Sequence, residues 1–270
     1  MLTFIPTPIG NPQDITLRAM KLFEKAELFL CEDTRHTKRL LRLLEERFGM
    51  VYPNADFISF NEHNGEERLR EFGAVLEEKE VVYVSDAGMP VISDPGQILV
   101  AYCQEKQIKY DVLPGASAVT TAYAASGFEE GKFLFFGFLP HKGKERNAAL
   151  NEAMNNGYNT VLYEAPHRLE KFLKEVLLID AQREFFLAKE ISKKFQTYFR
   201  GTAEELAEQF GSISIKGEWV VIIRAKKSTS KSLHFDEVLQ LDLPPKPKAK
   251  LLARLSDRSI AEWYQELIKN

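Results

Sequence analysis

Cysteine is scarce in this chain, and its spacing fits no metal-binding or disulfide framework. Only Cys31 and Cys103 occur among 270 residues, and they lie far apart in the sequence. A disulfide scaffold and a zinc site both need more cysteines at closer, recurring spacings. We therefore predict that both thiols are buried in the core and that the protein holds no metal.

Long apolar runs are missing as well. No stretch approaches the roughly 20 apolar residues that a membrane span requires. The chain starts directly with a strand-like run instead of a charged segment followed by an apolar signal core. We expect a cytoplasmic protein that does not associate with a membrane.

Neither sign of charge is in large excess. The 36 Lys and Arg and the 39 Asp and Glu leave a net charge of −3, whereas nucleic-acid binders usually present a basic surface. Residues 224–270 differ, because ten Lys or Arg against six Asp or Glu give this segment a net charge of +4. Phosphate contacts need only local basic clusters, although such clusters are more often plain solvated surface. The clusters that could face RNA are Lys142–Arg146, Lys193–Phe195, Arg224–Lys231 and Lys246–Lys250.

Strand-like and helix-like runs alternate over residues 1–112. A hydrophobic content of 44% is enough for a proper core, and the alternation is typical of βαβ units. Asp14 fits the N-cap of the first helix, and Thr34 precedes the basic second helix. The predicted strands are 3–7, 27–31, 57–60 and 80–85, and the predicted helices are 15–25, 35–48, 66–78 and 95–106.

The second half of the chain has aromatic strands with hairpin-like spacing, which favours a mixed sheet. A hinge near 112–117 and a small-residue helix at 116–125 precede strands at 133–136, 160–163, 184–187, 197–199 and 219–223. From Lys226 the composition is that of a linker, with a Pro-rich segment at 244–247 before a last helix over 256–269. The sequence predicts an α/β protein with domains at 1–112 and 113–225, a cleft between them, and a small helical appendage at 226–270.

Three junctions rich in Gly and Pro follow strand-like runs, at Thr7–Pro12, Asp86–Gly96 and Pro114–Ala118. Glycine lets the backbone approach a ligand closely, proline fixes the backbone, and parallel sheets bind ligands beyond the carboxyl ends of their strands. Each junction alone is most simply a turn. Together, the three junctions predict one shared binding cleft.

Seven motifs in this order resemble the tetrapyrrole-methylase superfamily of S-adenosylmethionine-dependent methyltransferases. The branch they resemble most methylates a cytidine 2′-oxygen in 16S ribosomal RNA. The motifs are Thr7–Asn11, Glu32–Arg35, Asp86–Gly96, Pro114–Ala118, Gly137–Pro140, Pro166–Arg168 and Lys216–Glu218. The sequence departs from the family pattern at Met89 (Thr is usual), Ala116 (Pro), Ala165 (Ser) and Ile191-Ser192 (Leu-Thr), and Met89 matters most because it lies in the cofactor loop.

The resemblance implies S-adenosylmethionine as the cofactor, a homodimer, and 16S ribosomal RNA or the small ribosomal subunit as the partner. The cofactor is expected between the two domains. The implied cofactor-binding residues are Pro8, Ile9, Gly10, Asp86, Gly88, Met89, Ile92, Ser117, Ala118, Tyr163 and Gly217.

The catalytic candidates are Glu32, Asp33 and Arg35, which follow the strand-like run Leu28–Cys31. A carboxylate near the cofactor can polarise a ribose hydroxyl or take its proton. The alternative is a structural role, because acidic residues at the start of a helix often cap it or form an ion pair with a nearby basic side chain. The substrate-binding candidates are His63, Glu164, His167, Arg168, Lys189 and Lys193, although a lone histidine such as His63 more often makes a purely structural hydrogen bond.

Two other functions remain open. One is a methyltransferase of the same fold that acts on a tetrapyrrole or another small molecule. The other is a non-catalytic RNA-binding factor for ribosome assembly with a vestigial cofactor pocket. The departure from the family pattern at Met89 is the reason to retain this alternative. A dinucleotide dehydrogenase is disfavoured, since no G-x-G-x-x-G motif follows the first strand.

Overall fold

A computed structural model describes residues 1–61, 64–93, 96–211, 213–226 and 235–268. By its internal contacts the chain divides into two units, Met1–Lys226 and Lys227–Asn270. The first unit contains two β-sheets with their helices, and the described part of the second, residues 235–268, contains helices only. Each unit is described by itself.

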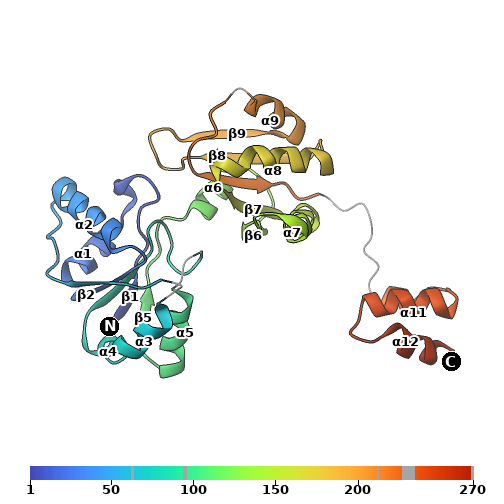
Figure 1. Cartoon of the computed structure of the whole chain (residues 1–270), viewed down its shortest axis with the longest axis horizontal. Helices are drawn as coiled ribbons and strands as arrows, with labels where there is room; N and C mark the ends of the chain where they lie inside the picture. The colour runs from blue at the N-terminus through green and yellow to red at the C-terminus, as the bar shows by residue number, and fades with distance from the viewer. Residues whose placement is uncertain (62–63, 94–95, 212, 227–234, 269–270) are drawn as a thin grey trace. The chain divides into compact units, whose positions relative to one another are not determined.

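The first sheet is entirely parallel, as the alternating pattern predicted. Its five strands lie in the order β3-β2-β4-β1-β5. Strands β1, β2 and β5 can be followed in Figure 1. The strands are β1 (Leu2–Phe4), β2 (Leu28–Cys31), β3 (Asp56–Ser59), β4 (Val81–Val84) and β5 (Tyr110–Val112). The connecting helices are η1 (Pro12–Asp14), α1 (Leu17–Lys25), α2 (Thr34–Phe48), α3 (Gly65–Phe72), α4 (Val75–Glu78) and α5 (Gln97–Lys106).

Strand β2 shows how the two faces of this sheet are covered. Phe29 and Cys31 pack with α1 and α2 in one core cluster. Leu28 and Leu30 point to the opposite face and pack with α4 and α5. Because side chains alternate along a strand, an uninterrupted apolar run produces a sheet that is buried on both faces. The result is a three-layer α/β/α arrangement.

The second sheet is mixed, which confirms the prediction for this half of the chain. Its order is β6-β7-β10-β8-β9; β6 and β7 pair in parallel, and the other neighbours are antiparallel. The strands are β6 (Phe133–Phe138), β7 (Asn159–Glu164), β8 (Glu184–Lys189), β9 (Thr197–Thr202) and β10 (Trp219–Ile223). Helix α6 (Ala118–Ser126) packs on one face, and α7 (Gly143–Asn155), α8 (Pro166–Ile179) and α9 (Ala203–Phe210) pack on the other.

The predicted starts of α1 and α2, the first two helices around this sheet, are wrong by one or two residues. Thr16, not Asp14, caps α1, because its hydroxyl accepts a hydrogen bond from the N–H of Ala19, while Asp14 lies in η1. Thr34 is the first residue of α2, and Asp33 is its cap. Several residues with capping side chains stand in a row at each start, so composition alone does not select among them. The predicted helix 66–78 is two helices, α3 and α4, which are separated at Gly73 and Ala74.

The second unit packs three helices around a small core. They are α10 (Phe235–Gln240), α11 (Pro245–Arg254) and α12 (Ile260–Leu267), and the core is Val238, Ala249, Leu252 and Trp263. The indole N–H of Trp263 donates to the hydroxyl of Ser256 at 2.8 Å. The Pro-rich segment 244–247 starts α11 and does not belong to a linker, because proline fits the first turn of a helix, where its missing N–H costs no hydrogen bond.

Both cysteines are core thiols, as predicted. Each is fully buried and unpaired, and burial raises the pKa of Cys31 to about 12 and that of Cys103 to about 11. Within the described ranges, no group of three or more His, Cys, Asp or Glu side chains has the geometry to hold a metal ion. No helix in the described part of the chain is long and apolar enough to cross a membrane.

Candidate active site

A cavity of about 430 Å³ lies in the first unit and takes its lining from both sheets. The first sheet contributes residues that follow β1, β2 and β4, all at the carboxyl ends of parallel strands. Ligand sites of open parallel sheets occupy this edge. The lining residues are Ile9, Glu32, Ser85, Ala87, Gly88, Met89, Ile92, Ser93, Ser117, Ala118, Phe138, Tyr163, Glu164, Ala165, Pro166, Ile191, Glu218, Trp219 and Val220.

The three Gly/Pro junctions meet at Gly88. Thr7 and Gly88 exchange two backbone hydrogen bonds of 3.0 Å, which join the first junction to the second. Gly88 has φ +81°, and a Cβ there would lie 3.2 Å from Ile9 Cγ2 and 3.7 Å from the carbonyl of Ala116, in the third junction. Glycine adopts this backbone conformation without steric cost, whereas a side chain here would crowd Ile9. The predicted shared cleft is therefore present in the structure.

The predicted cofactor-binding residues divide into two sets. Seven of the eleven line the cavity: Ile9, Gly88, Met89, Ile92, Ser117, Ala118 and Tyr163. The other four, Pro8, Gly10, Asp86 and Gly217, lie outside the lining but next to residues of it. Burial raises the pKa of the Tyr163 hydroxyl, which favours its protonated, uncharged form.

Gly217 and Gly10 support the cavity wall by letting other side chains approach closely. Gly217 has φ +116°, and a Cβ there would lie 2.8 Å from Glu190 Cγ. Glu190 Oε1 accepts hydrogen bonds from the N–H of Glu218 at 2.8 Å and from Lys193 at 3.0 Å. Burial opposes ionisation of Glu190, but these hydrogen bonds outweigh it and keep its pKa below the ordinary value. A Cβ on Gly10 would lie 2.5 Å from Lys193 Cγ, so Lys193 packs over that glycine.

The acidic motif after β2 contributes one residue to the cavity. Glu32 lines it, and its carboxylate accepts a hydrogen bond from the N–H of Asp86 at 3.1 Å. Asp33 caps α2 through the N–H of Arg35 at 2.8 Å and binds the guanidinium of Arg35 at 2.6 Å. The hydrogen bonds from Arg35 hold the pKa of Asp33 well below its usual range. Asp33 and Arg35 thus make the structural contacts that the alternative interpretation predicted, just outside the lining.

His36 was missed by sequence reasoning. Its Nδ1 lies 2.9 Å from Asp86 Oδ2, so the loop after β4 is joined to the first turn of α2. The only signal for it was its position directly after the Glu32–Arg35 motif.

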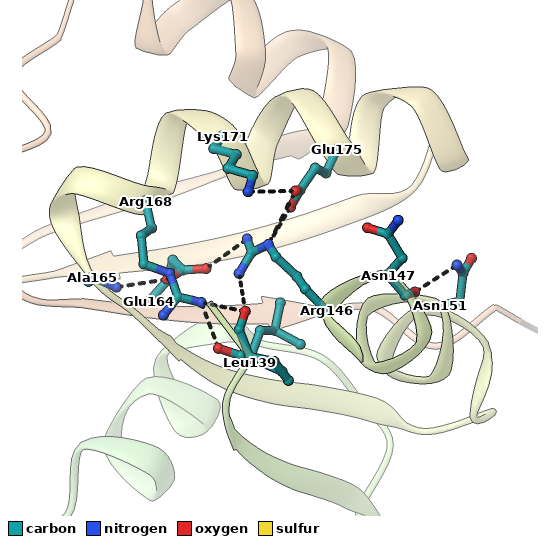
Figure 2. Close-up of polar contacts among 10 residues, drawn as sticks. Leu139, Arg146, Asn147, Asn151, Glu164, Ala165, Arg168, Lys171 and Glu175 are labelled. Atoms are coloured by element: carbon teal, nitrogen blue, oxygen red, sulfur yellow. Dashed lines mark hydrogen bonds and ion pairs between the residues drawn. The ribbon is translucent and has the colours of Figure 1, made fainter. Parts of the chain in front are cut away.

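A buried ion network holds Glu164 at the end of β7 (Figure 2). Arg146 Nη2 lies 3.3 Å from Glu164 Oε2, and Arg168 Nε lies 3.1 Å from Glu164 Oε1. Arg146 also binds Glu175 at 2.8 Å. Arg146 is only 1% exposed, so its predicted membership of an RNA-facing cluster is wrong. Its neighbours Lys142 and Lys144 are exposed.

The remaining substrate candidates differ in their surroundings. Lys189 donates to the carbonyl of Ser214 at 2.7 Å and lies over the ring of Trp219. Lys193 pairs with Glu190 and Glu218. His167 is exposed in the first turn of α8, and His63 lies outside the described residues.

Three cavity residues were not among the site residues predicted from the sequence. Trp219 and Phe138 supply aromatic surface, and Ser85 supplies a polar atom. Among the described residues, Ser85 Oγ is the single buried side-chain N or O atom that has no hydrogen-bond partner. An unpaired buried hydroxyl in a cavity wall is suited to bind a polar group of a ligand.

The family model described as Tetrapyrrole (Corrin/Porphyrin) Methylases matches residues 1–207. The chain belongs to the tetrapyrrole methylase family. All the cavity residues of the first sheet, and those of the second as far as Ile191, fall inside the matched segment.

Similar proteins within this family are named ribosomal RNA small subunit methyltransferase I. That of Helicobacter pylori is 43% identical over 98% of this chain and 96% of its own length. That of Campylobacter fetus is also 43% identical, over 99% of this chain and 100% of its own length. That of Escherichia coli O157:H7 is 35% identical over 94% of this chain and 90% of its own length.

Solved structures share the fold at lower identity. Cobalt precorrin-4 methyltransferase matches with a TM-score of 0.59 at 17% identity over 83% of this chain and 94% of its own. Uroporphyrin-III C-methyltransferase from Thermus thermophilus, complexed with S-adenosyl homocysteine, matches with a TM-score of 0.54 at 17% identity. The match covers 83% of this chain and 96% of that chain. These likenesses confirm the tetrapyrrole-methylase fold that the sequence predicted.

Proposed function

We propose that this chain transfers a methyl group from S-adenosylmethionine to the 2′-oxygen of a cytidine in the decoding region of 16S ribosomal RNA. The observation that carries the proposal is the 43% identity, over 98% of the chain, to a protein named ribosomal RNA small subunit methyltransferase I. The tetrapyrrole methyltransferases match at 17% identity over 83% of the chain. That difference favours RNA over a tetrapyrrole as the substrate.

The cavity fits S-adenosylmethionine in size and in chemistry. Small-molecule sites usually enclose about 300–1,000 Å³, with apolar walls and a few placed polar groups, and the cavity of about 430 Å³ falls within this range. Ile9, Met89 and Val220 supply apolar surface, and Ser85 Oγ supplies a buried polar atom without a protein partner. S-adenosylmethionine supplies an electrophilic methyl group on a sulfonium sulfur.

Met89 is compatible with this use of the cavity. Its side chain is partly buried in the lining, and the cavity is present beside it. The neighbouring Gly88 is fixed by backbone hydrogen bonds to Thr7, which no side-chain exchange at residue 89 removes. The vestigial-pocket alternative, which rested on Met89, therefore has no structural observation in its favour.

Glu32 is the residue that we assign to the ribose hydroxyl. A general base must reach the proton that it takes and must be basic enough to hold it. Glu32 lines the cavity, whereas Asp33 lies outside it and has a depressed pKa because Arg35 donates to its carboxylate. Asp33 therefore positions Arg35 at the start of α2, where the exposed guanidinium can contact an RNA phosphate.

The proposed substrate-binding residues have two tasks. Exposed His167 is free of the Glu164 network and is assigned to direct RNA contact, together with His63. Glu164, Arg168, Lys189 and Lys193 fix the edge of the cavity through their ion pairs and hydrogen bonds. Lys142, Lys144, Lys194, Lys246 and Lys250 are exposed and supply sequence-independent attraction to phosphates.

The proposed domain boundaries are 1–112, 113–225 and 226–270, and the proposed state is a cytoplasmic homodimer. Light scattering after gel filtration tests the dimer, because a dimer has about twice the chain mass of 30.9 kDa.

The substrate is tested by methyl transfer from labelled S-adenosylmethionine. Small ribosomal subunits from cells lacking this protein, free 16S ribosomal RNA and a tetrapyrrole, uroporphyrinogen, are offered in parallel. Label on the subunits or the RNA supports the proposal, and label on the tetrapyrrole alone overturns it. If calorimetry detects no binding of S-adenosylmethionine and no label is transferred, the RNA-binding assembly factor becomes the better account.

A further inference from the structure

Phe138 is an unusual member of the cavity wall. It is 58% exposed although it lines the cavity, whereas Leu139, the next residue, is buried. Single exposed apolar side chains are common on protein surfaces, but an exposed aromatic ring in a cavity wall presents a flat apolar face to a ligand. Its exposure places the ring at the rim of the cavity and leaves it accessible from outside.

A β-bulge gives Phe138 this position. The parallel pairing of β6 with β7 matches Phe135 with Val161 and Gly137 with Leu162, so Phe136 is an extra residue. Phe138 then pairs with Tyr163; without the extra residue it would pair with the following residue of β7 and face the opposite side of the sheet. Gly137 has φ +73°, which accommodates the irregularity. Bulges next to active sites commonly re-aim a side chain.

The buried ion network fixes the chain directly after Phe138. The Arg168 guanidinium donates to the carbonyl of Leu139 at 2.6 Å (Figure 2). It also donates to the carbonyl of Pro140 at 3.2 Å. Arg146 also donates to the Pro140 carbonyl at 3.2 Å. On the other side, the ring of Tyr163 lies 5.3 Å from that of Phe138, at an interplanar angle of 55°. The backbone directly after Phe138 is thus fixed and Tyr163 contacts the ring, while more than half of the Phe138 surface stays exposed.

A rigid, exposed ring at a cavity rim binds planar heteroaromatic groups. Two are available to this enzyme, the adenine of S-adenosylmethionine and the base of the target nucleotide. A small ligand enclosed in a cavity has most of its surface buried, whereas the base of an RNA strand arrives from outside and is splayed out onto aromatic side chains. An accessible rim position matches the second case.

We infer that Phe138 is the stacking platform for the base of the nucleotide that is methylated. The inference rests on the proposed function and adds to it a residue that orients the substrate. Stacking of the base on Phe138 would hold the attached ribose at one place in the cavity, which is the condition that an in-line methyl transfer needs.

The test compares Phe138→Ala and Phe138→Leu with Phe138→Tyr. Leucine keeps apolar bulk without a ring, and tyrosine keeps the ring. A matched control is Tyr158→Ala, since Tyr158 is an exposed aromatic residue next to the other end of β7 and does not line the cavity. For each variant, kcat and KM are measured with small ribosomal subunits from cells lacking this protein, and the Kd for S-adenosylmethionine is measured by calorimetry.

Loss of one base stack is expected to lower kcat/KM for the subunits by about 10- to 100-fold in Phe138→Ala and Phe138→Leu. We expect kcat/KM of Phe138→Tyr and Tyr158→Ala to stay near the wild-type value. The Kd for S-adenosylmethionine is expected to be unchanged in all four variants. An equal loss of S-adenosylmethionine affinity would assign the ring to adenine and overturn the inference. Full activity of Phe138→Leu would overturn it as well. Failure of the proposed function itself is distinguishable, because the wild-type protein would then transfer no label to the subunits.

Discussion

Two acidic residues reach the same cavity from two sheets, and their surroundings are opposite. Glu32 follows β2, and its neighbours Asp33 and Arg35 form an ion pair in which the Arg35 side chain is 86% exposed. Glu164 ends β7, and the side chains of its ion pair with Arg146 are each 1% exposed. The sequence predicted Glu32 as a catalytic residue and Glu164 as a substrate-binding residue. Burial separates them, because Glu32 is only partly buried and can meet a substrate in the cavity, whereas Glu164 is buried and its carboxylate is committed to ion pairs in the protein interior.

The largest effect that we expect from the difference between Glu32 and Glu164 is on the stability of the protein. Arg146→Ala leaves Glu164 and Glu175 without their shared buried partner, so we expect the free energy of unfolding to fall by about 3–5 kcal/mol. Urea unfolding measures this. Lys174→Ala is the control, because it removes an exposed ion pair on α8 and should have no measurable effect. A loss below about 1 kcal/mol in Arg146→Ala would show that the network is not structural.

The next effect is on catalysis at the other carboxylate. Glu32→Gln keeps an oxygen that can accept the hydrogen bond from Asp86 N–H but removes the basic group. We expect kcat for methyl transfer to fall by about 100-fold, while the Kd for S-adenosylmethionine changes little. Single-turnover transfer to small ribosomal subunits measures this. Wild-type activity in this variant would remove Glu32 from its proposed role.

Binding of S-adenosylmethionine depends on the backbone at Gly88 more than on the side chain at Met89. Gly88→Val places a β-branched residue at φ +81° against Ile9, so we expect the Kd to rise by about 10-fold or more. Met89→Thr introduces the residue usual in the family, and we expect a change of less than about 3-fold. Calorimetry on both variants, with melting temperatures as a check on folding, measures this. The reverse order of effects would mean that side-chain contacts at residue 89 dominate binding.

The smallest effect concerns the charge on Asp33. Because Arg35 lowers the folded-state pKa of Asp33, its ionised form stabilises the protein above the ordinary pKa near 4, and this stabilisation is lost as the pH falls below that value. Asp33→Asn keeps an N-cap but removes the charge. The wild type should therefore be slightly more stable than the variant at pH 7, and this difference should shrink on acidification and at high salt. A difference that grows at low pH would contradict the pairing.

Much of the first sheet was predictable from the sequence. Strands β2 and β4 are continuous apolar runs that end at acidic or Gly- and Pro-rich segments, so both the βαβ order and the cavity edge could be read from local pattern. Helix starts were less certain, since Asp14, Thr16, Asp33 and Thr34 are all capping residues and only the backbone conformation selects among them.

Other features depend on tertiary contacts. Arg146 lies in a sequence cluster with Lys142 and Lys144, and nothing local distinguishes it, yet Glu164 and Glu175 bury it. The exposure of Phe138 follows from a one-residue bulge between β6 and β7, and the pairing of two strands is not visible in either strand alone. His36 is joined to Asp86 across 50 residues. Such pairings arise only when distant segments fold together.

The most direct test of the account is the position of the transferred methyl group. Small ribosomal subunits from cells lacking this protein are incubated with the wild-type protein and S-adenosylmethionine, and the digested 16S ribosomal RNA is analysed by mass spectrometry. The account predicts 2′-O-methylcytidine in a fragment from the decoding region, and its formation about 100-fold more slowly with Glu32→Gln under single-turnover conditions. A methyl group on a base, or on no part of the RNA while S-adenosylmethionine still binds, would contradict it.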